Sequence, residues 1–140
     1  MRVLVIDDEP DVLLLCRVNL EFAGHEVIET TDAAQGVAMA TSEHPDLIVL
    51  DVMLPSRDGL SVLEELGELP ETREVPVVLL TAKAQEEDQL KGWQAGAAEY
   101  VTKPFSPISL TRAVEAVHRM TPAQREERRD QAVADLVDRP

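Results

Sequence analysis

Three short runs of consecutive apolar residues constrain the fold of this chain more than any other feature of its sequence. They are VLVI at 3–6, LIVL at 47–50 and VVLL at 77–80. A strand with one solvated face alternates apolar and polar side chains, whereas a strand buried on both faces is continuously apolar. These runs therefore predict the central strands of a parallel sheet that is covered on both sides.

Two further runs, VIET at 27–30 and EYVT at 99–102, mix apolar and polar residues and suit edge strands. Segments with helical periodicity alternate with the strands, over 10–22, 33–43, 58–66, 85–95 and 107–119. Strands that alternate with helices build right-handed, parallel α/β sheets. The sequence thus predicts an α/β fold in which five helices flank a doubly wound, five-stranded parallel sheet.

The segment 121–140 differs from the rest of the chain. Thr121 and Pro122 are residue types preferred at a helix N-cap and in its first turn, but the stretch QREERRDQ that follows is almost wholly polar. Only a small apolar patch near the C-terminus interrupts it. We expect one domain over 1–120 and a polar helical tail or linker over 121–140.

Composition excludes several classes of partner. The formal net charge of -14 would repel a nucleic-acid backbone rather than attract it. No stretch approaches the roughly 20 apolar residues of a membrane span, and the N-terminal apolar run is too short for a signal peptide. The single cysteine, Cys16, cannot form an internal disulfide, which fits a reducing compartment. We expect a cytoplasmic protein that binds neither nucleic acid nor membrane.

Acidic residues stand where two of the predicted central strands end. Asp7 and Asp8 follow the first run, and Asp51 follows the third. Sites in open parallel sheets form at the carboxyl ends of the strands, so these carboxylates would converge if the strands are neighbours. Two unit charges about 4 Å apart repel by about 4 kcal/mol at an effective dielectric of 20. Three carboxylates together therefore predict a site for a hard divalent ion such as Mg²⁺, although each alone could be an ordinary loop residue.

Two other strand ends carry groups that suit a phosphoryl ligand. Thr81 closes VVLL, and Lys103 followed by Pro104 closes the last run. A hydroxyl can donate to a phosphoryl oxygen, and an ammonium supplies compact positive charge to the same group. Alone, Thr81 could be a strand-end cap and Lys103 a surface charge. Together with the acids they indicate phosphoryl transfer to a carboxylate.

At this point the sequence resembles the response-regulator receiver domain, the phosphoacceptor part of two-component signalling. The resemblance covers about residues 2–119. It is carried by Asp7-Asp8, by LIVLDVMLP around Asp51, by VVLLTA ending at Thr81-Ala82 and by YVTKPF around Lys103. It implies a flavodoxin-like fold, with the strand order 2-1-3-4-5 also found in chemotaxis-regulator-like phosphoacceptors.

The resemblance also implies roles for the residues that transfer the phosphoryl group. Asp51 is expected to be the phosphorylated nucleophile, and Thr81 and Lys103 are expected to act beside it as catalytic residues. The bond between Lys103 and Pro104 is expected to be cis. Phosphorylation is expected to draw Thr81 toward the phosphoryl group and let Tyr100 fill the vacated space, so these two residues form the predicted switch.

A Mg²⁺ site is implied in the same way. Asp8 and Asp51 are expected to ligate the ion together with the backbone carbonyl of Met53, and Asp7 to act largely through water. Met53 and Lys83 lie two residues beyond Asp51 and Thr81, at positions that in this family influence the approach of hydrolytic water. We expect the apolar Met53 to slow dephosphorylation.

As a receiver, the chain would be a signalling switch rather than a turnover enzyme. It would accept a phosphoryl group from a histidine kinase or a phosphotransfer protein. The modification would then change the signalling face, formed by 85–95, 99–102 and 107–119, and so control a downstream protein. Lys91 and a partly exposed Trp93 are expected on this face. Pairing of two copies through this face or through the tail stays open.

Three alternatives remain beside this interpretation. The chain could be the receiver part of a longer response regulator, such as a transcription factor, whose output domain follows the tail. It could be an aspartyl-phosphate phosphatase of the haloacid-dehalogenase kind, but that chemistry needs an acid where this chain has Met53. A receiver that serves only as a binding scaffold is disfavoured by the complete acidic pocket.

Overall fold

The computed structural model describes residues 1–82 and 85–138. The elements, in chain order, are β1 (Arg2–Ile6), α1 (Pro10–Phe22), β2 (Glu26–Thr30), α2 (Ala33–Ser42), β3 (Leu47–Asp51), α3 (Gly59–Glu68), β4 (Val77–Thr81), α4 (Glu86–Gln94), β5 (Glu99–Thr102), α5 (Pro107–Arg119) and α6 (Pro122–Val137). The five strands form one parallel sheet in the order β2-β1-β3-β4-β5. The predicted α/β fold and strand order are confirmed.

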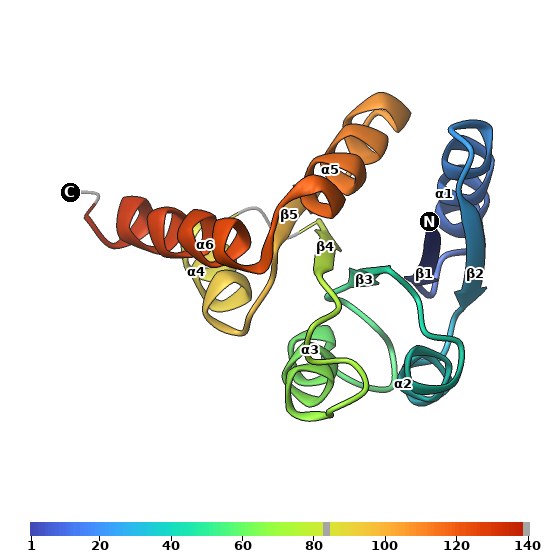
Figure 1. The fold of residues 1–140 in the computed structure, drawn as a ribbon, viewed down its shortest axis with the longest axis horizontal. Helices are drawn as coiled ribbons and strands as arrows, with labels where there is room; N and C mark the ends of the chain where they lie inside the picture. The colour runs from blue at the N-terminus through green and yellow to red at the C-terminus, as the bar shows by residue number, and fades with distance from the viewer. Residues whose placement is uncertain (83–84, 139–140) are drawn as a thin grey trace.

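Helices cover both faces of the sheet (Figure 1). Helices α1 and α5 pack together on one face, and α2 and α3 pack together on the other. Helix α4 lies beside β5 and contacts α6. None of the helices in the described part of the chain is long and apolar enough to cross a membrane.

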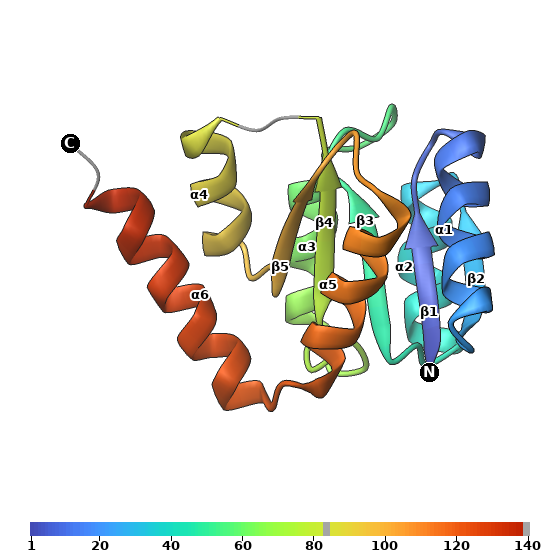
Figure 2. The ribbon, with the colours of Figure 1, turned by 90° about the horizontal axis from the view of Figure 1, so that it is seen from above.

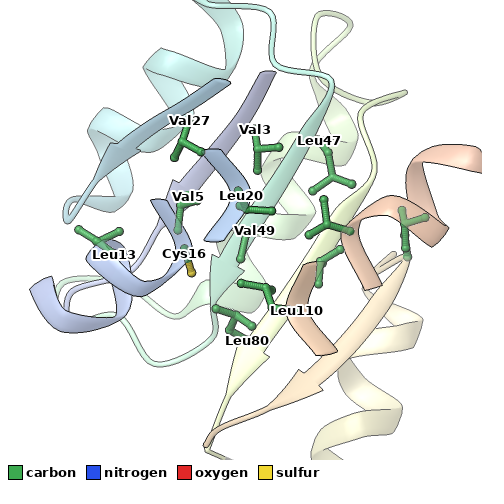
Figure 3. Close-up of a cluster of buried hydrophobic side chains, with 14 residues drawn as sticks. Val3, Val5, Leu13, Cys16, Leu20, Val27, Leu47, Val49, Leu80 and Leu110 are labelled. Carbon is green, nitrogen blue, oxygen red and sulfur yellow. The ribbon is translucent and has the colours of Figure 1, made fainter. Parts of the chain in front are cut away.

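The continuous apolar runs fill a core on each side of the sheet. Successive side chains of a strand point to opposite faces, so Val3 and Val5 enter the cluster under α1 and α5, whereas Leu4 and Ile6 enter the cluster against α2 and α3. Figure 3 shows the first cluster, in which Cys16 of α1 lies among aliphatic side chains. Because β1, β3 and β4 are buried on both faces, their backbones are held rigidly where they lead into the loops.

Side-chain caps fix where two of the helices begin. Asp32 caps α2 by accepting a hydrogen bond from the backbone N–H of Gln35, and Ser106 caps α5 through the N–H of Ser109. Helix α3 extends beyond the predicted 58–66 to Glu68, because Gly67 takes part in the helix instead of ending it.

The C-terminal tail adds a sixth helix whose position the sequence did not reveal. Thr121 caps α6 with a capping box to Gln124. One side of α6 contacts α4 and covers Trp93, whose exposed fraction is 5%. We expected Trp93 to be a partly exposed residue of the signalling face; this was wrong, because α6 lies over it. The division into 1–120 and 121–140 stays a prediction.

Candidate functional site

The site lies where the carboxyl ends of three adjacent strands meet. Strands β1, β3 and β4 are neighbours and parallel, so they end at the same edge of the sheet (Figure 2). Asp7 directly follows β1, Asp51 is the last residue of β3, and Thr81 is the last residue of β4. The fold therefore brings to one edge residues that lie up to 74 positions apart in the sequence.

Four acidic side chains cluster at this edge. Asp7, Asp8, Glu9 and Asp51 each offer a carboxylate oxygen, and these oxygens all lie within 4.8 Å of one another. Asp7 is fully buried and Asp51 is 2% exposed, whereas Asp8 is half-buried and Glu9 is exposed. Sequence reasoning missed Glu9, although its place directly after the two aspartates was a usable signal.

Lys103 supplies positive charge to the acidic cluster. Its Nζ lies 2.8 Å from Asp7 Oδ2, 3.1 Å from Glu9 Oε1 and 3.2 Å from Asp51 Oδ2. The backbone N–H of Lys103 donates to the carbonyl of Thr81, which ties the lysine to the end of β4. The Lys103–Pro104 bond is cis, as predicted.

Burial and the neighbouring opposite charge shift the pKa values of Asp7 and Lys103 in opposite directions. Burial raises the pKa of Asp7 above its ordinary value, and the nearby charge of Asp51 adds to the effect, although Lys103 partly compensates. Burial alone would lower the pKa of Lys103, but its ion pairs with Asp7 and Asp51 raise the pKa above the ordinary lysine value. One lysine thus faces several carboxylates, and the site retains negative charge that favours a cation.

The donor set fits a hard divalent ion. Asp7 Oδ2 is fully buried and lies 2.8 Å from the Lys103 ammonium, so this buried carboxylate already requires a cation beside it. Carboxylate and carbonyl oxygens are the ligands that Mg²⁺ prefers, and the described cluster offers only oxygens. Asp8, Asp51 and the carbonyl of Met53 remain the predicted ligands.

Asp51 is held by the loop that follows it. The backbone N–H of Met53 donates to Asp51 Oδ1 at 3.0 Å, and the N–H of Val52 donates to the carbonyl of Leu80 at 3.0 Å. Gly59 lies against this turn: a Cβ there would overlap the Asp51 carbonyl oxygen and lie 2.6 Å from Val52 Cα. A side chain at position 59 would therefore push the loop after β3 out of place.

The two predicted switch residues touch each other. Thr81 is fully buried, and its side chain is hydrogen-bonded to that of Tyr100. Burial, with a contribution from the charge of Asp88, raises the pKa of Tyr100 to about 12. The Tyr100 ring also packs on Gly92 of α4, where an added Cβ would lie 3.3 Å from Tyr100 Cδ2. The ring therefore connects the end of β4 to α4.

The structure brings together the predicted residues Asp7, Asp8, Asp51 and Lys103 in one cluster, and Thr81 ends the adjacent strand. The backbone of Met53 contacts Asp51, and its side chain is 52% exposed. Lys83 lies outside the described residues.

Known proteins share both the sequence and the fold of this chain. Comparison with models of known protein families matches residues 3–115 to the response regulator receiver domain. The chain is 42% identical over 120 residues to the DNA-binding dual master transcriptional regulator RpaA of Synechocystis sp., covering 86% of this chain and 50% of that protein. It is 42% identical over 118 residues to the alkaline phosphatase synthesis transcriptional regulatory protein PhoP of Bacillus subtilis, covering 84% and 48%. The chain thus spans about half the length of these curated relatives.

Solved structures agree with this match. The chemotaxis protein CheY4 of Vibrio cholerae superposes with a TM-score of 0.79 at 27% identity, covering 83% of this chain and 97% of that one. A CheY-like response regulator receiver domain protein from Methanospirillum hungatei gives a TM-score of 0.76 at 27% identity, covering 96% and 97%.

Proposed function

The chain belongs to the response regulator receiver domain family, and from that premise we propose that it is a Mg²⁺-dependent signalling switch whose Asp51 accepts a phosphoryl group. The observation that carries this proposal is the contact of Lys103 Nζ with Asp51 Oδ2 at 3.2 Å inside a cluster of four acids. A carboxylate at the end of a strand, with an ammonium beside it, suits nucleophilic attack on a phosphoryl group.

The phosphodonor is a histidine kinase or a phosphotransfer protein that carries phosphohistidine. A carboxylate oxygen of Asp51 attacks the phosphorus, so a P–O bond forms while the P–N bond breaks and the imidazole leaves with the electron pair. Lys103 contacts the phosphoryl oxygens, and the Thr81 hydroxyl donates to one of them. Hydrolysis by water later restores the Asp51 carboxylate and releases phosphate, which sets the lifetime of the signal.

Mg²⁺ would be held by Asp8, Asp51 and the Met53 carbonyl, with Asp7 acting through water. When bound, the ion neutralises the charge that the carboxylate and the phosphoryl oxygens bring together. The acidic surplus around Lys103 supports this assignment, because a second cation relieves the repulsion among the carboxylates.

Phosphorylation then changes the face formed by α4, β5 and α5. Thr81 moves toward the phosphoryl group, and Tyr100 follows into the space it leaves. The contact of Tyr100 with both Thr81 and Gly92 supports this coupling, because the ring cannot move without altering its packing on α4. A downstream protein, or a second copy of the chain, would recognise the altered face.

A second candidate is the receiver part of a longer transcriptional regulator. It is favoured by relatives that are transcriptional regulators of about twice the matched length. In either case Asp51 has the same role.

A cytoplasmic location also remains a prediction, which cell fractionation would test.

The decisive experiment is incubation with a small phosphodonor such as acetyl phosphate, with and without Mg²⁺, followed by intact mass spectrometry. We expect one added phosphate that requires Mg²⁺ and is lost in Asp51→Asn. Modification of Asp51→Asn at the wild-type level would overturn the assignment. Continuous hydrolysis of the donor at a rate typical of an enzyme would instead favour the aspartyl-phosphate phosphatase.

A further inference from the structure

Helix α6 rests on α4 without entering the core. No residue of α6 is buried, but residues at helical spacing along one side are half-buried. These residues are Arg125, Arg129, Ala132, Val133 and Leu136. Figure 2 shows α6 running in the opposite direction to α4 along the β5 side of the molecule. The helix is therefore an attached layer rather than a part of the sheet.

Two neighbouring arginines make the specific contacts. The guanidinium of Arg128 lies 5.5 Å from the centroid of the Trp93 ring, and its Nε donates to Glu99 Oε2 at 3.1 Å. Arg129 donates to the backbone carbonyls of Gly96 and Ala97, each at 3.2 Å. These carbonyls lie two and three residues beyond Gln94, the last residue of α4, and positive charge is favourable near a helix C-terminus.

The apolar part of the contact between α4 and α6 is open to solvent. A cleft of about 460 Å³ remains between the two helices, lined by Trp93 of α4 and by Val133, Ala134 and Val137 of α6. Water can enter this cleft, so the apolar side chains along it are only partly removed from solvent and gain little from burial. The attachment of α6 thus depends on a few polar contacts at the surface, and such contacts are individually weak.

From this geometry we propose that α6 is a reversible cover over α4 and β5, and that its docking and the phosphorylation of Asp51 oppose each other. The proposal rests on the proposed function. Tyr100 follows Glu99, the partner of Arg128, and its ring packs on Gly92, the neighbour of Trp93. A movement of Tyr100 therefore disturbs both surfaces on which Arg128 lies.

The coupling must act in both directions. If phosphorylation weakens the docking of α6, then weakening the docking by mutation must favour the phosphorylated conformation by the same factor. A helix that docks equally well in both states would shift neither equilibrium. This reciprocity separates a regulatory cover from a helix that only adds stability.

Trp93 is the only tryptophan of the chain, so it reports directly on the cover. The experiment measures acrylamide quenching of its fluorescence in the full chain, before and after addition of Mg²⁺ and BeF₃⁻ as a phosphoryl mimic. Binding of the mimic is titrated separately through the ¹⁹F resonance of the bound group. Variants with Arg128→Ala and Arg129→Ala combined, or with Val133→Asp, weaken the cover. Arg119→Ala removes an exposed arginine at the end of α5 and is the matched control.

We expect the mimic to increase the quenching of Trp93 in the wild type and in Arg119→Ala. Both cover variants should be strongly quenched from the start and should bind the mimic about fivefold more tightly or better. The proposal is overturned if the mimic binds while Trp93 stays protected, or if the cover variants titrate like the wild type. If the wild type fails to bind the mimic, the proposed function fails as well, and quenching in the variants still shows whether α6 covers Trp93.

Discussion

The strand-end site and the contact between α4 and α6 both depend on charged side chains, but the fold holds them in opposite ways. Asp7 and Asp51 are almost completely buried at the ends of strands, whereas Arg128 belongs to a helix without a buried residue. Charges on rigid strands keep their positions whether or not a ligand is present. Charges on a docked helix can separate from their partners, so the first region suits chemistry and the second suits regulation.

This difference has an energetic counterpart. Removing one partner of a buried ion pair leaves an uncompensated charge, which costs about 3–5 kcal/mol, whereas an exposed pair contributes about 0–1 kcal/mol. Substitutions in the two regions should therefore differ clearly in their effects on the free energy of unfolding.

The largest loss of stability is expected for Lys103→Met. Without the ammonium, Asp7 and Asp51 lie side by side with no described cation between them, so the free energy of unfolding should fall by about 3 kcal/mol. Added Mg²⁺ should restore part of this loss by taking over the compensating charge. Urea denaturation with and without Mg²⁺ measures both effects, and unchanged stability would show that the strand-end charges are well solvated.

Gly59→Ala should cost about 2 kcal/mol, because the new methyl group overlaps the backbone beside Asp51. Such a loss would show that the rigid strand-end site extends into the loop after β3. Gly67→Ala in the same helix is the control, since its Cβ would meet nothing within 4 Å and should stabilise the helix. Equal urea midpoints for the two variants would contradict the close packing at Gly59.

The pKa of the buried Cys16 thiol reports how strongly the core beneath the site disfavours a charge. Burial raises the pKa of its thiol from 9.0 to about 12. The unfolded chain loses this proton near pH 9 while the folded chain keeps it, so stability should fall as the pH rises from about 9 to 12, by up to about 1.4 kcal/mol per pH unit. Burial of Tyr100 adds a slope of the same sign over a narrower range, from about pH 10 to 12. Cys16→Ala should flatten the urea stability profile, and an unchanged slope would show that the thiol is not the responsible group.

Arg129→Ala should have a smaller effect, of about 1 kcal/mol or less, since its two hydrogen bonds to backbone carbonyls lie at the edge of the protein. Thermal unfolding beside Arg119→Ala provides the comparison. A loss as large as that of Lys103→Met would remove the distinction between the two regions.

Met53→Asn should leave stability nearly unchanged, because the side chain is 52% exposed. Its effect should appear in the lifetime of the aspartyl phosphate, which we expect to shorten because a polar side chain beside Asp51 admits water more readily. Intact mass spectrometry over time after removal of the phosphodonor measures the lifetime. An unchanged lifetime would end this interpretation of Met53.

The strand-end site was predictable because backbone topology alone brings its residues together. Continuous apolar runs identified β1, β3 and β4, and the residue after each run had to lie at one edge of the sheet. Glu9 was missed because it lies at the entrance to α1, where an acid has an ordinary role near a helix N-terminus. The core positions followed from the same alternation of side chains across each strand.

The position of α6 was not predictable from its pattern. Its capping signal at Thr121 was visible, but the contacts that place it come from long arginine side chains that reach α4 and the carbonyls after it. Such side chains look the same in sequence whether they are solvated or bound. The exposure of Trp93 was misjudged for this reason, since its burial depends on a helix that begins 29 residues later.

The central claim is that Asp7, Asp8, Asp51, Thr81 and Lys103 act as one phosphoacceptor site. A crystal structure of the full chain with Mg²⁺ and BeF₃⁻ tests it most directly. We predict BeF₃⁻ bonded to a carboxylate oxygen of Asp51, within hydrogen-bond distance of Lys103 Nζ and Thr81 Oγ1, with Mg²⁺ on Asp8, Asp51 and the Met53 carbonyl. BeF₃⁻ bound to another carboxylate, or Asp51 unmodified beside an occupied Mg²⁺ site, would contradict the account.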